Sequence, residues 1–171
     1  MTSGGPATAS LLAFLAQHGI AFEHCAHPAV FTCEESERLV PKLPGAKTKN
    51  LFVTDKKGRR HFLLVVSQEA RVDLAALSDR LAVKGLRFAS EERLFDRLGI
   101  TPGAVSFLAL INDRERVVEP YFEASIWAAD AIQAHPLANT ATVVIPKTGV
   151  ERFLAATGHV ASVLSVPAAD A

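Results

Sequence analysis

The feature that most restricts the fold is a pair of β-rich runs joined by a short turn. Residues 50–54 and 61–67 are rich in Val, Leu and Phe, and residues 55–58 (Asp-Lys-Lys-Gly) lie between them. Two such runs separated by a glycine-containing connection predict a β-hairpin. Because a hairpin pairs its strands antiparallel, it argues against a purely parallel, doubly wound sheet.

Helical and strand-like segments alternate irregularly along the rest of the chain. Apolar spacing, capping residues and glycine or proline breaks predict helices over 8–18, 32–40, 72–82, 90–98 and 149–157. Further strands are predicted over 20–25, 86–89, 104–111, from Arg116 onward, 141–145 and 160–166. The pattern predicts an α+β fold with a mixed, largely antiparallel sheet and flanking helices.

The length and composition are those of a globular domain. The chain has 171 residues, of which 49% are apolar and 21% charged, so we expect a single domain over 1–171 with residues 1–6 frayed. The apolar stretch 11–16 is too short to span a bilayer, and no basic segment precedes it as in a signal peptide. We therefore expect a cytoplasmic protein with no membrane partner.

Basic residues are concentrated in one segment, although the net charge is zero. Residues 42–60 hold seven basic residues and one acid, and the remainder holds 11 basic residues and 17 acids. Such a basic strip can bind phosphates while the acidic remainder discourages indiscriminate nucleic-acid binding, so we expect no DNA partner. A solvated hairpin tip is the alternative interpretation. The strip comprises Lys42, Lys47, Lys49, Lys56, Lys57, Arg59 and Arg60.

Two short segments are candidates for a reactive site. Lys49 lies where a Pro-Gly loop meets the strand 50–54, where a lysine can pair with a phosphate or a carbonyl oxygen, or act as a base when desolvated. In Gly99-Ile-Thr-Pro-Gly103, a turn could expose the N–H groups of Gly103 and Ala104 to a carbonyl oxygen. Each has an alternative, purely structural interpretation: Lys49 as an ordinary surface lysine, Gly99 as a helix C-cap and Pro102-Gly103 as a turn before the next strand.

Other reactive side chains lack the surroundings that their chemistry requires. His135 precedes a predicted buried strand and could orient a substrate hydroxyl or amine, although Pro136 also fits a strand edge. The histidines lack metal-ligand spacing, which predicts no metal site. Ser106 lacks a nucleophile elbow, and no motif supports Cys33 as a nucleophile. No glycine-rich nucleotide motif follows a strand.

Four segments, taken in order, resemble the YbaK/ProX superfamily, free-standing relatives of the editing domain of bacterial prolyl-tRNA synthetase. They are His27-Pro-Ala-Val-Phe-Thr32, Gly45-Ala-Lys-Thr-Lys-Asn-Leu-Phe52, Gly99-x-x-Pro-Gly-x-Val-Ser106 and His135-Pro-Leu-x-Asn-Thr140. The likeness runs from about Ala7 to Gly158 and is greatest to the ProX (PrdX) branch, the alanyl-tRNA(Pro) deacylases. Two departures are a Phe-Leu-Ala-Leu run after Ser106, where relatives often have Pro-Phe, and the lack of an aspartate near Val118.

The resemblance implies a YbaK-like fold that hydrolyses the ester of a mischarged tRNA without a metal or organic cofactor. Lys49 matches the essential lysine of the family, and Gly103 belongs to its Gly-x-x-Pro-Gly loop, so we expect both to act in catalysis. The expected substrate-binding residues are Phe31, Thr32, Asn50, Gly99, Pro102, Ala104, Ser106 and His135.

The implied partner is the acceptor stem of tRNA(Pro) with its 3′ aminoacyl-adenosine, and prolyl-tRNA synthetase is a second candidate. Duplex RNA is recognised largely by shape and phosphate contacts, which a basic strip supplies. The expected tRNA contacts are Lys47, Lys56, Lys57, Arg59 and Arg60.

Three functions remain open at this point. The first is hydrolysis of Ala-tRNA(Pro), because a synthetase pocket built for proline rejects a smaller residue by only about 1–3 kcal/mol per methylene. The second is the same fold acting on Cys-tRNA(Pro) or another small aminoacyl-tRNA. The third is a non-catalytic module that captures tRNA or a synthetase.

Overall fold

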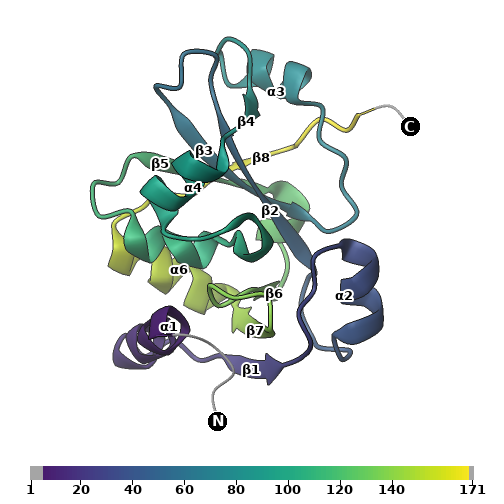
Figure 1. Ribbon diagram of the computed structural model, residues 1–171, viewed down its shortest axis with the longest axis vertical. Helices are drawn as coiled ribbons and strands as arrows, with labels where there is room; N and C mark the ends of the chain where they lie inside the picture. Colours follow the sequence, from purple (N-terminus) through teal and green to yellow (C-terminus); the bar gives the residue numbers. More distant parts are fainter. Residues whose placement is uncertain (1–5, 170–171) are drawn as a thin grey trace.

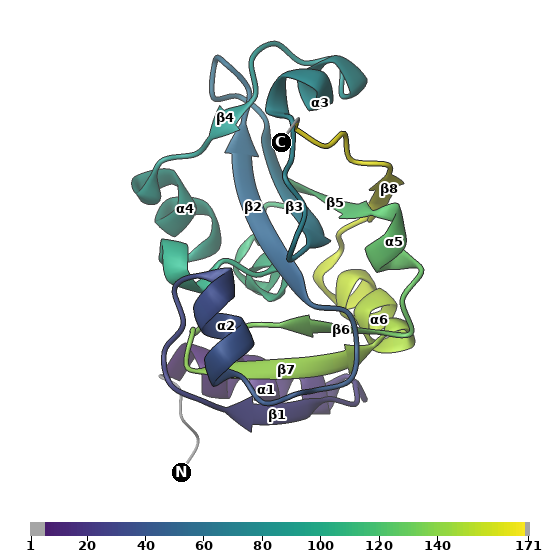
Figure 2. The same ribbon diagram turned by 90° about the vertical axis from the view of Figure 1, so that its right-hand side faces the viewer.

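The computed structural model describes residues 6–169, whose strands form two sheets (Figures 1 and 2). The smaller sheet is antiparallel, in the order β1 (Glu23–Ala26), β7 (Ala141–Pro146), β6 (Ala131–Ala134). The larger sheet is mixed, with β4 antiparallel to β2, β2 antiparallel to β3, and β3, β5 and β8 parallel. Its strands are β4 (Arg87–Phe88), β2 (Thr48–Thr54), β3 (His61–Ser67), β5 (Val118–Glu123) and β8 (Ser162–Leu164).

Helices flank both sheets, and several begin at a side chain that caps their first turn. Thr32, Asp73 and Ser90 accept hydrogen bonds from the main-chain N–H three residues later. The α-helices are α1 (Pro6–Gln17), α2 (Cys33–Leu39), α3 (Leu74–Arg80), α4 (Glu91–Leu98), α5 (Ala124–Trp127) and α6 (Lys147–Thr157). Two 3₁₀ segments are η1 (Pro102–Ala104) and η2 (Phe107–Asn112).

The predicted hairpin is confirmed as β2 and β3. The strands pair from Thr48 with Ser67 to Thr54 with His61. At the tip, the Asp55 carboxylate accepts hydrogen bonds from the N–H groups of Arg59 at 2.7 Å and Arg60 at 3.1 Å. These bonds stabilise the turn and lower the pKa of Asp55.

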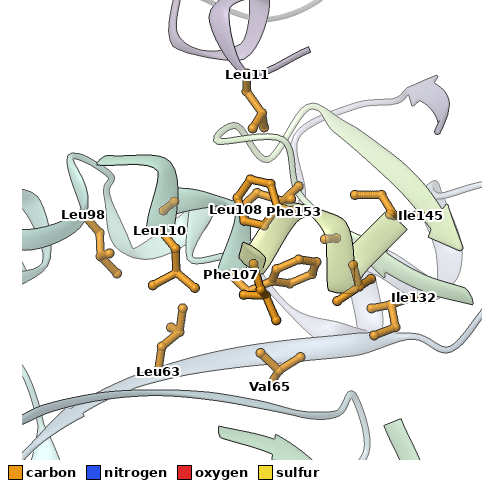
Figure 3. Close-up of a cluster of buried hydrophobic side chains, with 14 of the residues drawn as sticks. Leu11, Leu63, Val65, Leu98, Phe107, Leu108, Leu110, Ile132, Ile145 and Phe153 are labelled. Atoms are coloured by element: carbon orange, nitrogen blue, oxygen red, sulfur yellow. The ribbon is translucent and has the colours of Figure 1, made fainter. Parts of the chain in front are cut away.

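The main hydrophobic core lies between the two sheets (Figure 3). Phe107 and Phe153 pack edge to face there, with ring centroids 5.9 Å apart. Leu63 and Val65 of β3 contribute from one side, and β6 and β7 from the other. A second cluster packs β2 and β3 against α3 on the opposite face of the larger sheet; it comprises Val53, Phe62, Leu64, Val66, Leu77 and Leu86.

The α+β class is confirmed, but the strands form two sheets rather than one. The predicted strand over 104–111 is wrong, because this segment forms η1 and η2. Its continuous apolar run is buried all round, a pattern that periodicity cannot assign to strand or helix. The Ser106 hydroxyl accepts the Leu108 N–H at 3.1 Å and so favours the helical turn. The short elements β6 and α5 were not predicted.

No helix within residues 6–169 is long and apolar enough to cross a membrane.

Candidate active site

A cavity of about 170 Å³ opens where the start of β2 meets the end of β6, the residues before and within α2, and η1. Figure 2 shows α2 and the lower end of β2 on this side of the molecule, next to β6. Most of the predicted site residues line this cavity: Phe31, Thr32, Lys47, Lys49, Asn50, Pro102, Gly103 and His135.

The loop that leads into β2, with Lys47 at its end and Lys49 just beyond it, is attached to β6 by hydrogen bonds. The Gln133 side-chain amide donates to the carbonyls of Leu43 at 3.0 Å and Pro44 at 3.1 Å. The main chain adds a bond from Gln133 N–H to Ala46 at 2.9 Å, and the Thr48 hydroxyl donates to the Gln133 carbonyl at 2.7 Å. These bonds hold the start of β2 against β6 and so position the side chains that follow.

Lys49 is half-buried and lines the cavity. Among residues 6–169 its ammonium has no carboxylate within 4.0 Å, whereas Lys47 pairs with Glu37 at 2.8 Å. A buried or half-buried charge without a partner retains its attraction for an anion or a carbonyl oxygen. Of the two lysines, Lys49 is therefore the better placed to bind a substrate.

Asn50, beside Lys49, has a buried side-chain oxygen that lacks a hydrogen-bond partner among the described residues. Buried polar atoms are nearly always paired, so such an atom in a cavity wall is suited to a ligand. Asn50 therefore supplies an acceptor for a donor group of the substrate.

His135 is held as a neutral imidazole. Its Nδ1 lies 3.0 Å from the Ala141 carbonyl oxygen, which can only accept, so Nδ1 carries the proton and Nε2 has the lone pair. Burial lowers the pKa of His135; the bond to Ala141 opposes this shift, and the nearby His27 adds to it. Neutral Nε2 can accept a hydrogen bond from a substrate ammonium or hydroxyl.

The structure brings only part of the Gly-x-x-Pro-Gly loop to the cavity. Pro102 and Gly103 line it, and a Cβ on Gly103 would lie 3.3 Å from the Asn139 amide and 3.6 Å from the Phe31 ring. Gly99 instead ends α4 at a φ of +65°, with its N–H donating to Phe95 at 2.8 Å. A side chain at position 103 would therefore crowd the Asn139 amide and the Phe31 ring in this part of the cavity wall.

Two further expected residues lie outside the cavity lining. The Ala104 N–H donates to the Thr101 carbonyl at 3.0 Å, so it is engaged in the η1 turn. Ser106 is fully buried and caps η2 through its hydroxyl. Their place in η1 and η2, which the sequence did not predict, explains why neither meets the cavity.

The two residues that directly precede α2, Phe31 and Thr32, line the cavity. Phe31 is 73% exposed, although it is a large apolar side chain. Thr32 accepts the Glu35 N–H at 3.0 Å and so begins α2. An exposed aromatic ring at a cavity mouth is suited to contact a planar or apolar part of a ligand.

The basic strip does not form one patch. Lys56, Lys57 and Arg59 are exposed at the hairpin tip, about 20 Å from Lys49 along β2 at the usual rise per residue of a strand. Arg60 forms a two-point contact with Glu119 at 3.0 and 2.8 Å, which raises the pKa of Arg60. Its guanidinium also lies over an aromatic ring of β3. Arg60 is therefore less available to RNA than its neighbours.

Sequence reasoning missed several residues of the cavity wall. Gln133 lies on β6, which was too short and too weakly alternating to be predicted. Thr142 also lines the cavity, and its hydroxyl lies 2.8 Å from His27 Nε2. Gln68 follows β3 and hydrogen-bonds the Cys33 carbonyl at 3.3 Å. No local motif marks these residues, because their neighbours come from distant parts of the chain.

Comparison with known proteins decides the family. Residues 27–153 match the aminoacyl-tRNA editing domain, a match that covers most of the chain and all the cavity elements described above. The chain belongs to the aminoacyl-tRNA editing domain family. Enzymes of this family are hydrolases of the ester between an amino acid and tRNA, and the editing domain described here is one of them.

Individual relatives support the same assignment. The editing domain is 37% identical over 133 residues to the prolyl-tRNA editing protein ProX of Acetoanaerobium sticklandii, covering 78% of this chain and 81% of the relative. It is 40% identical over 141 residues to a prolyl-tRNA synthetase associated domain-containing protein of Danio rerio, covering 81% and 76%. A solved structure described as a candidate trans-editing enzyme for prolyl tRNA synthetase shares the fold, with a TM-score of 0.72 at 20% identity over 98% and 100% of the two chains.

Proposed function

We propose that this editing domain, acting as a single domain over residues 1–171, hydrolyses Ala-tRNA(Pro) to alanine and tRNA(Pro). The observation that carries the proposal is the convergence of Lys49, the unpartnered Asn50 oxygen and Gly103 on one small cavity. The resemblance to a prolyl-tRNA editing protein supports tRNA(Pro) as the nucleic acid.

The reaction needs little covalent chemistry from the protein. Water attacks the ester carbonyl, the tetrahedral oxyanion collapses, and the ribose oxygen of the tRNA leaves with a proton. The Gly103 N–H would donate to the developing oxyanion, and Lys49 would hold the phosphate of the terminal adenosine or the ester itself. A ribose hydroxyl of the substrate would position the water.

Size selection would come from the cavity walls. Alanine is smaller than proline, so a narrow site can admit the wrong residue and exclude the right one, which a synthetase pocket cannot do. Phe31, Pro102 and His135 bound the cavity and are the side chains that would limit the size of the amino acid. The other expected substrate contacts (Gly99, Ala104 and Ser106) would act through the position of this wall.

The acceptor stem would be steered by exposed lysine and arginine side chains. Lys56, Lys57 and Arg59 are exposed at the hairpin tip and suited to phosphate contacts. Lys47 and Arg60 would contribute after exchanging their carboxylate partners for phosphate. Prolyl-tRNA synthetase is the second partner proposed, and the cytoplasm, where tRNA is charged, is the proposed location.

A deacylation assay tests the proposal. Purified protein is incubated with Ala-, Cys-, Ser- and Pro-tRNA(Pro), and the loss of each ester is compared with that in buffer. We expect Ala-tRNA(Pro) to be hydrolysed fastest and Pro-tRNA(Pro) to be spared. Faster hydrolysis of Cys-tRNA(Pro) or Ser-tRNA(Pro) would mean that the substrate carries that amino acid instead of alanine. No hydrolysis above the rate in buffer would mean that the protein is a non-catalytic module that binds tRNA or a synthetase.

A further inference from the structure

The edge of β2 beside the cavity is unpaired. β2 pairs along its whole length with β3, whereas β4 covers only Val53 and Thr54 on the other side. The last bond on that side runs from the Ala89 N–H to the Phe52 carbonyl at 3.0 Å. The main-chain groups of alternate residues point to the same side of a strand in an antiparallel ladder. Asn50, two residues before Phe52, therefore directs its N–H and C=O to the open edge.

Asn50, the residue with these unpaired main-chain groups, lines the cavity. Within residues 6–169 its N–H and C=O have no hydrogen-bond partner, and the same holds for its buried side-chain oxygen. Asn50 and Gly103 both line the cavity, whose wall is completed by η1. An open strand edge is a site where extended main chain from another molecule can pair.

An aminoacyl ester contains the same unit as a residue in a strand. Its α-ammonium nitrogen, Cα and carbonyl are arranged as the N, Cα and C=O of a peptide residue. In an antiparallel ladder, a hydrogen-bonded pair of residues exchanges two bonds, each N–H donating to the other C=O. The edge at Asn50 offers one donor and one acceptor in this arrangement.

We propose that the aminoacyl group of the substrate pairs with the main chain of Asn50 as a one-residue strand. The α-ammonium donates to the Asn50 carbonyl, and the Asn50 N–H donates to the ester carbonyl oxygen. The inference rests on the proposed deacylase function and deepens it by naming how the site recognises an α-amino acid ester.

The pairing has a consequence for catalysis and another for selectivity. When water adds to the ester carbonyl, the oxygen becomes negative, so the Asn50 N–H bond strengthens together with that of Gly103. Main-chain pairing accepts the backbone of every α-amino acid alike. The choice among amino acids is then left to the side-chain space of the cavity.

Two variants of Asn50 distinguish the contribution of its main-chain N–H to hydrolysis from that of its side chain. Asn50→Ala removes the side-chain amide and keeps the N–H, whereas Asn50→Pro removes both. Proline is tolerated on an edge strand where the N–H has no partner, so the fold should survive, as circular dichroism and thermal unfolding would verify. We expect Asn50→Pro to hydrolyse Ala-tRNA(Pro) about 100-fold more slowly than Asn50→Ala, or slower still.

Equal rates for the two variants would overturn the inference and leave the proposed function intact. A wild-type protein that fails to hydrolyse Ala-tRNA(Pro) would instead overturn the proposed function. The two failures are thus distinguishable in the same assay.

The substrate offers an independent test that needs no variant. Propionyl-tRNA(Pro) has the carbon skeleton of the alanyl ester without its ammonium. Because a hydrogen bond from a charged donor is lost, we expect kcat/KM, relative to hydrolysis in buffer, to fall about tenfold or more. An undiminished ratio would contradict the ammonium contact.

If Asn50→Pro does not fold, amide hydrogen exchange on the wild-type protein decides the donor contact. The probe is tRNA(Pro) carrying alanine through a non-hydrolysable amide. We expect exchange of the Asn50 N–H to slow when this probe binds, and unchanged exchange in the saturated complex would overturn the inference.

Discussion

The carboxylate of Asp113 accepts a hydrogen bond of 2.8 Å from Nε2 of His159, and both side chains are almost completely buried. Asp113 also accepts the N–H groups of Val117 and Val118, at 3.2 and 2.8 Å, where β5 begins. His159 follows the end of α6, and its Nδ1 lies 2.8 Å from the Thr157 hydroxyl. The pair therefore joins the start of a central strand to the end of a core helix.

We expect Asp113→Asn to lower the free energy of unfolding by about 2–4 kcal/mol. The amide cannot replace every acceptor contact, and removing one partner leaves buried groups unsatisfied. Urea unfolding followed by circular dichroism measures the loss. Asp55→Asn, at the exposed hairpin tip, is the matched control and should cost much less. Equal losses would refute a special structural role for the buried pair.

Replacement of Lys49 tests the charge in the cavity. Lys49→Met keeps the length of the side chain and removes the ammonium, so we expect hydrolysis of Ala-tRNA(Pro) to fall about 100-fold or more while the fold persists. Lys84→Met is the control, because Lys84 is exposed and lies outside the cavity lining. Single-turnover rates of the two variants are compared at the same enzyme concentration. Near-normal activity of Lys49→Met would remove this lysine from the mechanism.

The side chain of Gln133 should affect activity without touching the reacting ester. Gln133→Met has a similar volume but cannot donate to the carbonyls of Leu43 and Pro44. We expect about 1–3 kcal/mol less stability and a lower kcat, because the loop before Lys49 loses its attachment to β6. Gln133→Leu also lacks the donor, without adding a charge, and should show the same fall in kcat. A variant with wild-type kcat would show that this attachment is structural only.

Local patterns in the sequence predict the hairpin and the position of Lys49 where a loop meets a strand. They do so because a turn and the strand after it are determined by neighbouring residues. The 104–111 segment defeats this reasoning, since an apolar run buried on all sides suits a strand and a helix equally. Ala104, expected at the cavity from the turn at Pro102-Gly103, and Ser106, expected there from the family resemblance, do not line it.

The open edge at Asn50 is a tertiary property that no sequence pattern displays. It depends on where β4 ends its pairing with β2, and β4 has only two residues. Gln133 illustrates the same limit, because its role arises from a loop about 90 residues earlier in the chain. The type of fold is thus readable from local signals, whereas the arrangement of unpaired groups around the cavity is not.

Stability should fall as the pH drops below about 6.5, because the buried His61 and the half-buried His135 resist protonation in the fold. Burial lowers the pKa of His61, with Arg97 and Arg93 adding to the effect, and burial also lowers the pKa of His135. Between the ordinary pKa and these lowered values the unfolded chain binds protons that the folded chain does not, so acid favours unfolding there.

Urea unfolding at pH 7.5 and pH 5.5 measures this dependence. We expect His61→Asn to be less stable than the wild type at pH 7.5 but to lose less stability on acidification. A wild-type protein equally stable at both pH values would contradict the inference that the fold lowers the pKa of these two histidines.

The hairpin tip should govern the salt dependence of tRNA binding. Replacing Lys56, Lys57 and Arg59 together by alanine removes three exposed charges, so we expect weaker binding and a slope of log K against log salt that is shallower by about 2. Arg60→Ala should change the slope less, because Arg60 is held by Glu119. Fluorescence anisotropy with tRNA(Pro) over a series of salt concentrations gives both slopes. An unchanged slope in the triple variant would mean that the tip is only a solvated turn and that the acceptor stem binds elsewhere.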